Sequence, residues 1–228
     1  MIPELTVPEL PEDPACYLAF LQKSNLFEAA SYSDEDYNRT SQYQAEFKRK
    51  KLEGAVESID DYLKGLQMVG DTKPFEPSRY ARIAQLTQRS NQFNLRTIRY
   101  TEDDIERIAH DPSYLTLYYT LKDKFGDYGL VSVVIMKKAS DTQLFIDTWL
   151  MSCRVLKRGM EEFIINKVVD TARKADFTTI RAEYIPTAKN SMVRAIYEKM
   201  GFTALEDGQY LLTVSEYKEQ PIFITEGN

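Results

Sequence analysis

A cysteine, three basic residues and a glycine lie in one short stretch of the sequence: Cys153, Arg154, Lys157, Arg158 and Gly159. Residues 144–151, just before it, are mostly apolar and predict a strand buried on both faces. From residue 160 onward, apolar residues recur at three- and four-residue steps, which predicts a helix. Backbone N–H groups at the start of a helix attract anions. The sequence therefore predicts an anion site in this turn, bound by the three basic side chains and by the Gly159 amide.

Cys153 is the candidate nucleophile of this stretch. A thiol beside basic side chains at the start of a helix is favoured as the thiolate, the form that attacks an acyl group. A free cysteine is equally common as a small buried core residue. The sequence leaves both interpretations open.

Two further groups of polar residues are candidates for contact with a substrate. Asp147 stands among the apolar residues of the predicted strand, where its carboxylate could act as a base, bind substrate hydroxyl groups or cap a neighbouring backbone group. Asn91, Gln92 and Asn94 form a dense cluster of amides in a predicted loop. Such a cluster suits hydrogen bonding to a polar substrate, although asparagine-rich loops also satisfy their own backbone. The alternatives stay open for both groups.

The overall composition argues against several classes of function. The chain has 228 residues, 43% of them hydrophobic, which is enough for a globular fold with one sizeable core. A net charge of -6 argues against a general nucleic-acid partner. Two distant cysteines and the single histidine, His110, argue against a disulfide framework or a metal site. No apolar run approaches the roughly 20 residues that a membrane span needs, so we expect a cytoplasmic protein without a metal or a membrane partner.

The pattern along the chain predicts three parts. Residues 1–66 begin with a proline-rich, acidic segment and continue as a helical lead-in. Residues 67–217 form the main domain, and residues 218–228 form a tail that we expect to be poorly ordered.

The main domain is expected to alternate strands and helices. Three strands joined by short turns predict an antiparallel meander, and a helix then separates the meander from a further strand, which predicts a parallel pair. The expected bounds are 114–121, 129–136, 144–151, 179–184 and 210–214 for strands, and 158–174 and 190–200 for helices. The predicted class is a mixed α+β fold, with a central mixed sheet flanked by helices.

This order of elements resembles the fold of the GNAT superfamily of acyltransferases. That superfamily marks its pyrophosphate site with the pattern R/Q-x-x-G-x-G/A, which residues 154–159 match at the first and last positions. Residues 190–202 resemble its later pattern N-x-x-A-x-x-x-Y-x-K-x-G-F with slightly shifted spacing. The resemblance implies that Asn190 contributes to cofactor binding and that Tyr197 protonates the departing thiolate. A tyrosine at an apolar helical step is at least as often part of the core.

Lys157 is the main departure from the GNAT pattern, because it stands at the middle glycine. A side chain at this position would either crowd free coenzyme A or add a charge for a carrier-bound phosphopantetheine, and the sequence does not choose between them. The cofactor that the resemblance implies is therefore the phosphopantetheine arm of a carrier protein or coenzyme A.

Five longer strings are similar to the C-terminal half of FkbH-like proteins, which belong to subfamily IIIC of the haloacid dehalogenase superfamily. They are VPELPEDP (7–14), RIAQLTQRSNQFNLRT (82–97), DKFGDYGLV (123–131), DTWLMSCRVLKRGMEE (147–162) and EYIPTAKN (183–190). The role of that family implies transfer of a glyceryl group, taken from 1,3-bisphosphoglycerate, to the phosphopantetheine thiol of an acyl carrier protein in polyketide-type biosynthesis.

FkbH-like proteins join this half to a haloacid-dehalogenase-type phosphatase domain, whose nucleophile lies in a D-x-D motif after an apolar strand. No such strand precedes a D-x-D here, so we expect the phosphatase domain to be absent from this chain and to act as a partner beside the acyl carrier protein. Residues 1–66 would then resemble the end of that domain and its linker. Two alternatives remain, a coenzyme-A-dependent N-acetyltransferase and a non-catalytic module that docks a carrier protein.

Overall fold

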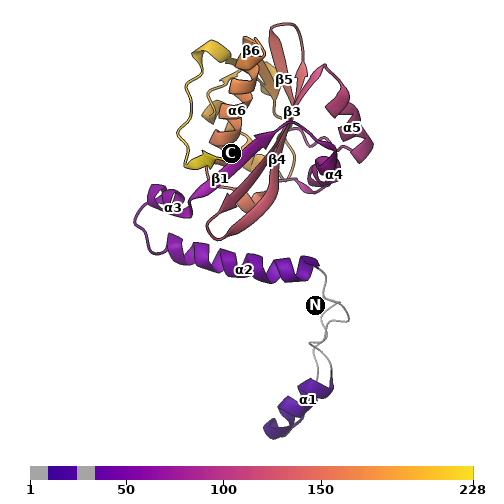
Figure 1. The fold of residues 1–228 in the computed structure, drawn as a ribbon, viewed down its shortest axis with the longest axis vertical. Helices are drawn as coiled ribbons and strands as arrows, with labels where there is room; N and C mark the ends of the chain where they lie inside the picture. Colours follow the sequence, from indigo (N-terminus) through magenta and orange to yellow (C-terminus); the bar gives the residue numbers. More distant parts are fainter. Residues whose placement is uncertain (1–9, 25–33, 228) are drawn as a thin grey trace. The chain divides into compact units, whose positions relative to one another are not determined.

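The computed structural model describes residues 10–24 and 34–227, and for residues 34–42 it describes the backbone only. The chain divides into two compact units, residues 1–44 and residues 45–228 (Figure 1). Most of the proline-rich segment predicted at the start of the chain lies outside the described residues.

The first unit contains two short helical elements in its described part. The 3-10 helix η1 (Pro14–Cys16) begins after Asp13, whose carboxylate accepts a hydrogen bond from the Ala15 N–H. Helix α1 (Tyr17–Lys23) follows directly. Helix α2 (Asp34–Glu53) begins in the first unit and continues into the second.

The second unit is built around a mixed sheet, which has nine strands within the described residues (Figure 1). The strands are β1 (Met68–Lys73), β2 (Phe93–Asn94), β3 (Tyr114–Asp123), β4 (Gly126–Lys138), β5 (Gln143–Met151), β6 (Thr179–Glu183), β7 (Thr203–Ala204), β8 (Gln209–Thr213) and β9 (Ile224–Glu226). Their order across the sheet is β7-β8-β6-β5-β4-β3-β1-β9, and β2 pairs with β5 beside this path.

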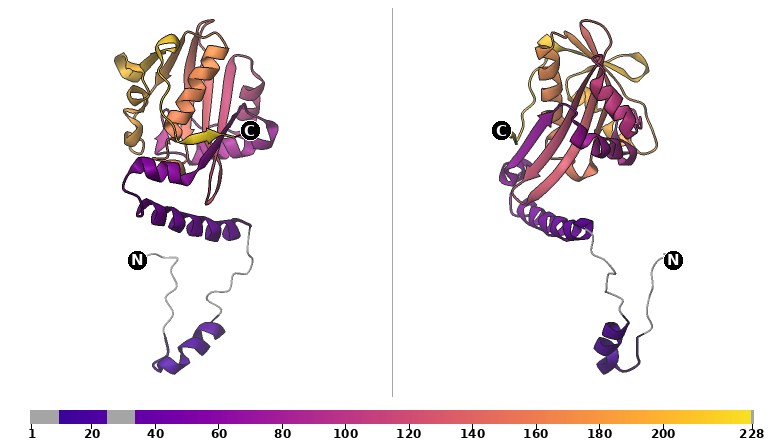
Figure 2. Two further views of the ribbon diagram at one scale, coloured as in Figure 1. Left: turned by 60° about the vertical axis from the view of Figure 1, so that its left-hand side comes forward. Right: turned by 45° about the vertical axis from the view of Figure 1, so that its right-hand side comes forward.

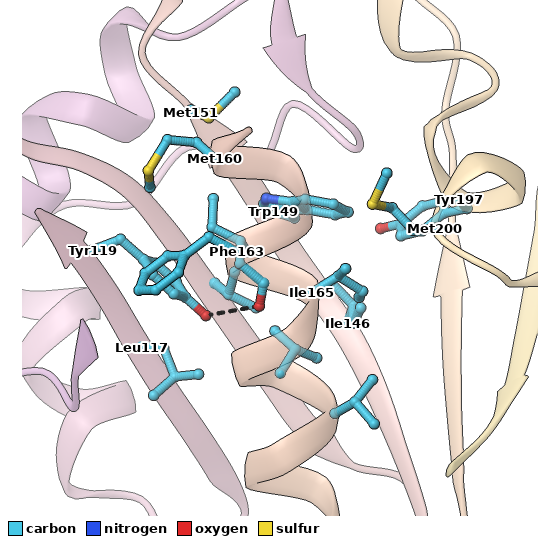
Figure 3. Close-up of a cluster of buried hydrophobic side chains, with 14 of the residues drawn as sticks. Leu117, Tyr119, Ile146, Trp149, Met151, Met160, Phe163, Ile165, Tyr197 and Met200 are labelled. Atoms are coloured by element: carbon cyan, nitrogen blue, oxygen red, sulfur yellow. Dashed lines mark hydrogen bonds between the residues drawn. The ribbon is translucent and has the colours of Figure 1, made fainter. Parts of the chain in front are cut away.

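Helices cover both faces of this sheet (Figure 2). They are α3 (Ile59–Leu66), α4 (Tyr80–Arg89), α5 (Glu102–His110), α6 (Met160–Lys174) and α7 (Ile196–Lys199). On one face, Phe163 and Ile165 of α6 belong to the larger hydrophobic core (Figure 3). On the opposite face, Ile83 of α4 and Ile105 of α5 belong to a second core. None of the helices in the described parts of the chain is long and apolar enough to cross a membrane.

The mixed α+β class and the order of its central elements are confirmed. Strands β3, β4 and β5 form the antiparallel meander, and β5 and β6 are parallel, with α6 between them in sequence. The helix predicted at 190–200 is instead a 3-10 turn, η4 (Ser191–Val193), followed by the short helix α7. The two are separate because the backbone at Ala195 (φ -100°, ψ 13°) leaves the helical region.

The C-terminal residues differ from the expectation of a poorly ordered tail. Strand β9 pairs in parallel with β1, with Met68 opposite Ile224. The buried side chain of Asn166 on α6 holds the preceding segment, because its amide oxygen accepts from the Gln220 N–H at 2.9 Å and its amide nitrogen donates to the Gln220 carbonyl at 2.9 Å. That prediction was wrong, since the segment finds its partners on elements far away in the sequence.

The end of α2 is fixed to the sheet by a buried ion pair. The Arg49 guanidinium donates to the two carboxylate oxygens of Asp123 at 2.7 and 2.9 Å. Asp123 also accepts from the N–H groups of Phe125 and Gly126 in the β3–β4 turn. Helix α3 joins the larger core through its buried face, which includes Leu66. Residues 45–66 therefore pack with the main domain rather than forming a separate helical lead-in.

Candidate active site

A β-bulge in β5 sets the geometry of the candidate site. In the pairing of β4 with β5, the register shifts between Ile135 and Met136, which leaves Asp147 without a partner on β4. An extra residue in a strand shifts the alternation of its side chains by one position. Trp149 therefore lies in the same core as Ile146, whereas a regular strand would place them on opposite faces.

The parallel strands β5 and β6 are paired over only their first part. Their pairs run from Gln143 with Thr179 to Ile146 with Ala182, and they end at the bulge. Residues 149–151, which we call the distal edge of β5, thus have no partner on β6. Ligands of sheets with parallel strands bind outside the carboxyl ends of those strands. The distal edge of β5 is therefore the first place to look for a ligand.

The turn between β5 and α6 contains two left-handed residues. Lys157 has φ 62° and Gly159 has φ 75°. Because only glycine adopts this region without a steric cost, the backbone at Lys157 favours glycine, the residue that the resemblance implies at this position. Gly159 is the N-cap of α6 and has no side chain that could accept from the first N–H groups of the helix.

The three basic side chains of this turn do not converge. Arg154 and Lys157 are exposed. Arg158 is 6% exposed and donates to the Tyr62 hydroxyl at 3.2 Å, while its guanidinium lies 3.8 Å from the Glu46 carboxylate. The predicted anion site therefore has two exposed cations beside it, and Arg158 is directed to α2 and α3.

Two acidic residues stand in the first turn of α6, at the predicted anion site. Burial, and then the neighbouring Glu162, raise the pKa of Glu161 from 4.5 to about 7. The Glu161 carboxylate also accepts from its own backbone N–H, one of the donors at the helix N-terminus. An anion bound here would compete with an ionised Glu161, so a lower pH favours the anion.

The distal edge of β5 is occupied by the chain itself. In strand β2, Phe93 pairs with Met151 and Asn94 pairs with Leu150. The next residue, Leu95, donates its N–H to the Trp149 carbonyl at 3.2 Å and accepts from the Ile185 N–H at 2.9 Å. Residues 93–95 thus lie between β5 and the end of β6.

Asn190, which the resemblance places at the cofactor, holds this segment. Its side chain is 0% exposed, and its amide nitrogen donates to the carbonyls of Asn94 at 2.9 Å and Ile185 at 3.0 Å. Its amide oxygen accepts from the Thr187 N–H at 2.7 Å and the Tyr184 hydroxyl at 3.2 Å. The side chain has two donors and one oxygen with two lone pairs, so this set of bonds uses its full capacity.

Tyr197 lies in the core on the α6 side of the sheet. Its ring is 5.8 Å from that of Trp149 and 5.0 Å from that of Phe202, and Figure 3 shows its hydroxyl on the side toward Trp149. Burial raises the pKa of Tyr197 well above that of an ordinary phenol, so the hydroxyl stays protonated. Among the described residues, neither this hydroxyl nor the Trp149 indole N–H has a hydrogen-bond partner.

Asp147, the unpaired residue of the bulge, belongs to a partly buried polar network. Its carboxylate accepts from the Arg96 guanidinium at 2.9 Å, from the Thr148 hydroxyl at 3.0 Å and from the Tyr100 hydroxyl. Arg96 also donates to the Glu183 carboxylate at 2.7 Å. The carboxylates of Asp147, in the middle of β5, and Glu183, at the end of β6, thus share one guanidinium.

The other predicted residues have separate places. Cys153 is exposed and begins the 3-10 helix η3 (Cys153–Val155), directly after β5. Asn91 bonds to the Arg99 guanidinium, and Gln92 is exposed. The Asn94 side chain is buried and bonds to its own loop, to the Ser90 carbonyl at 3.2 Å and the Thr97 N–H at 2.8 Å.

Sequence reasoning did not find the residues that complete the site. Arg96 and Tyr100 bond to Asp147 across long separations in the chain, and Glu183 joins the network through Arg96. No local pattern marks such contacts, because each residue is an ordinary member of its own segment. The one available signal was a carboxylate in each of the two strands predicted to be parallel, Asp147 in the middle of one and Glu183 near the end of the other.

Comparison with known proteins gives matches only among solved structures; no protein-family model and no curated protein matches the chain. The ribosomal-protein-S18-alanine N-acetyltransferase from Escherichia coli is 16% identical, with TM-score 0.48, over 67% of this chain and 99% of the other. Spermidine N-acetyltransferase from Vibrio cholerae, in complex with CoA and spermine, is 13% identical, with TM-score 0.49, over 66% and 98%. The GNAT domain of S. lividans PAT is 16% identical, with TM-score 0.49, over 62% and 89%. Independently of these matches, the antiparallel meander β3-β4-β5 and the parallel pair β5-β6 are the arrangement that the sequence predicted.

Proposed function

We propose that the chain is an acyltransferase whose acyl group travels on a pantetheine thiol bound at the distal edge of β5. The observation that carries this proposal is the separation of β5 from β6 at the Asp147 bulge, next to the helix start that follows β5. The buried Tyr197 hydroxyl has no partner among the described residues, and the Tyr197 ring lies 5.8 Å from that of Trp149 on the same edge. The two GNAT patterns at residues 154–159 and 190–202 add support from the sequence.

The residues of the turn suit the phosphate end of such a cofactor. Arg154 and Lys157 are exposed cations, and the first N–H groups of α6 have no side-chain cap from Gly159. The pantetheine end does not fit the present conformation, because residues 93–95 already pair with the distal edge of β5. The phosphate end could therefore bind to the present conformation, whereas the pantetheine end requires residues 93–95 to move.

The side chains around the bulge suit the proton transfers of acyl transfer. An acceptor thiol or amine must lose a proton, and the Asp147 carboxylate on the bulge is an acceptor of the right kind. The departing sulfur needs a donor, and the Tyr197 hydroxyl remains protonated because its pKa is raised by burial. Cys153, exposed at the end of β5, would carry the acyl group if the transfer has a covalent intermediate.

The finer proposal is transfer of a glyceryl group to the phosphopantetheine thiol of an acyl carrier protein. It rests on the five strings similar to FkbH-like proteins, and the phosphate would be removed by a separate phosphatase domain. The second candidate is a coenzyme-A-dependent N-acetyltransferase. The pair of carboxylates at Asp147 and Glu183 favours it, because an amine acceptor in its ammonium form needs an anionic partner.

The test follows acyl mass on every component. The chain is mixed with glyceryl-loaded and empty holo-carrier protein, and separately with acetyl-coenzyme A and a panel of amines. Transfer between carriers supports the glyceryl proposal, and acetylation of an amine supports the second candidate. Carrier binding without transfer, even with the phosphatase domain added, would replace both by a docking module.

Two variants assign the roles in the active system. Tyr197→Phe should lower the rate about 100-fold if its hydroxyl is the proton donor. Full transfer by Cys153→Ser would exclude the covalent intermediate and leave direct transfer at the same site.

A further inference from the structure

We propose that residues 93–95 fill the distal edge of β5 as a displaceable plug in the resting protein, and that an extended, amide-bearing chain replaces them when it binds. We call these three residues the plug. The inference rests on the proposed function, because it names phosphopantetheine as the chain that replaces the plug.

The plug makes strand-like contacts that a ligand of the right chemistry can replace. Phe93 and Asn94 are the whole of β2, and they pair with Met151 and Leu150. Leu95 adds one bond to the Trp149 carbonyl at 3.2 Å. These are backbone N–H and C=O contacts, which the amide groups of a pantetheine chain also supply. The opposite edge of β5 is paired with β4 from Leu144 to Met151, except at the Asp147 bulge, so a ligand chain can pair with β5 only at the distal edge.

One side-chain contact fastens the plug to the far wall of the site. Asn190 donates to the Asn94 carbonyl at 2.9 Å, while its remaining bonds go to residues 184–187 in the loop after β6. Releasing the plug breaks this bond of Asn190 and the backbone bond from the Ile185 N–H to the Leu95 carbonyl at 2.9 Å, and it leaves the other bonds of Asn190 in place. Asn190 thus holds the plug in place when the ligand is absent.

The residues beneath the plug contain donors that the plug does not satisfy. The Phe93 ring packs on Trp149 at 5.5 Å, and Trp149 packs on Tyr197 at 5.8 Å. Trp149 and Tyr197 are each 1% exposed, and their polar hydrogens have no acceptor among the described residues. The Phe93 ring offers no oxygen or sulfur acceptor to the Trp149 indole on which it packs, whereas a ligand carbonyl or sulfur in its place would offer one. The buried donors therefore point to a ligand richer in acceptors than the plug.

The position of the site also defines the rest of the ligand. The turn after the distal edge of β5 carries Arg154 and Lys157 and leads into the start of α6, where Gly159 supplies no side-chain cap and the Glu161 carboxylate accepts from its own N–H. A molecule that replaces the plug and continues along the turn should thus have an amide-bearing arm joined to a phosphate group. Free coenzyme A and a carrier-bound phosphopantetheine share this chemistry, and the arms of the experiment below distinguish them.

The sequence contains one tryptophan, Trp149, so its fluorescence reports directly on the plug. The protein is titrated with coenzyme A, with holo-carrier protein and with apo-carrier protein, and calorimetry measures binding independently. Binding of coenzyme A or of the holo-carrier should change the Trp149 emission. The apo-carrier, which lacks the arm, should leave it unchanged.

Two variants test whether the plug and the ligand compete. Asn190→Ala should tighten binding roughly fivefold, because it removes one hydrogen bond that holds the plug. Asn166→Ala is the matched control, since that buried asparagine holds a different backbone segment, at Gln220, and should not change the affinity.

A reversible disulfide that fixes the plug to β5, which we call the lock, keeps the test decisive if Asn190→Ala folds poorly. Asn94 and Leu150 are directly paired across two antiparallel strands, a position that suits a disulfide. Asn94→Cys with Leu150→Cys is made in a Cys16→Ser, Cys153→Ser background. The oxidised protein should lose binding at least tenfold, and reduction should restore it.

Different results would overturn the plug and the proposed function. Equal affinity in the oxidised and reduced lock, with unchanged Trp149 emission on binding, would overturn the plug and leave the proposed acyltransferase standing. Absence of binding to coenzyme A and to the holo-carrier, in wild type, in Asn190→Ala and in the reduced lock alike, would overturn the proposed function and the plug with it.

Discussion

Replacing Tyr197 with phenylalanine removes a hydroxyl that is buried without a hydrogen-bond partner among the described residues. The ring contacts with Trp149, Phe202 and Tyr210, at 5.0 to 5.8 Å, remain. An unsatisfied buried polar group costs about 1–3 kcal/mol. Because a phenol hydroxyl at the edge of a packed ring relaxes part of this cost, we expect the free energy of unfolding to rise by about 1 kcal/mol. For a chain of this size that corresponds to about 2–4 °C in Tm.

Tyr119→Phe is the matched control for this prediction. Tyr119 is also fully buried in the same core, but its hydroxyl donates to the Ile164 carbonyl at 3.4 Å (Figure 3). Its removal leaves that carbonyl with fewer partners, so we expect a loss of about 0.5–1.5 kcal/mol. The two substitutions are chemically identical and should have opposite signs.

Urea denaturation followed by far-ultraviolet circular dichroism measures both variants, and Trp149 fluorescence gives a second signal for the same transition. A loss of stability in Tyr197→Phe as large as that in Tyr119→Phe would refute the reasoning. It would mean that the Tyr197 hydroxyl has an acceptor in solution, and the argument for a ligand acceptor above it would fail.

Three further predictions concern strain and charge. Lys157→Gly should raise the free energy of unfolding by about 1 kcal/mol in urea, because the residue has φ 62°. Asp123→Asn should cost about 3 kcal/mol, since it leaves the buried Arg49 with only the 3.5 Å ion pair to the half-exposed Glu46. Burial opposes ionisation of Asp123, but the hydrogen bonds from Arg49 outweigh burial and lower the pKa of Asp123. The stability that the ion pair contributes is therefore present above about pH 4 and is lost as the pH falls further. A series of urea denaturation curves at different pH values would show this loss. The pKa of Glu161 is raised to about 7, so the unfolded state binds fewer protons than the folded state between about pH 4.5 and pH 7. As the pH rises through this range, the free energy of unfolding of wild type should fall relative to that of Glu161→Gln. Equal pH profiles of the two proteins would contradict the burial of Glu161.

The central elements of the fold could be predicted because the local spacing of apolar residues determines them. The meander, the switch to a helical period after residue 159 and the strand at 179–183 depend on neighbours along the chain. The turn was also visible, since a glycine after basic residues marks a helix start. The left-handed backbone at Lys157 agrees with the glycine that the pattern has there.

The parts that could not be predicted depend on contacts between distant segments. Asp147 reads as one polar residue in an apolar strand, and only the pairing with β4 shows that it is a bulge. Phe93 and Asn94 lie in an amide-rich loop, and nothing local indicates that they pair with β5. Arg158 looks like its neighbour Lys157, yet Tyr62 and Glu46 on distant helices draw it into the interior.

The central claim is that an amide-bearing arm joined to a phosphate binds across the distal edge of β5 and the start of α6. Hydrogen exchange with and without ligand tests it most directly, with saturating coenzyme A compared to adenosine 3′,5′-bisphosphate, which has the phosphates but no arm. Coenzyme A should protect residues 152–162 and speed exchange in residues 90–97, whereas the nucleotide should affect only residues 152–162. Unchanged exchange in both segments at saturating coenzyme A would contradict the account.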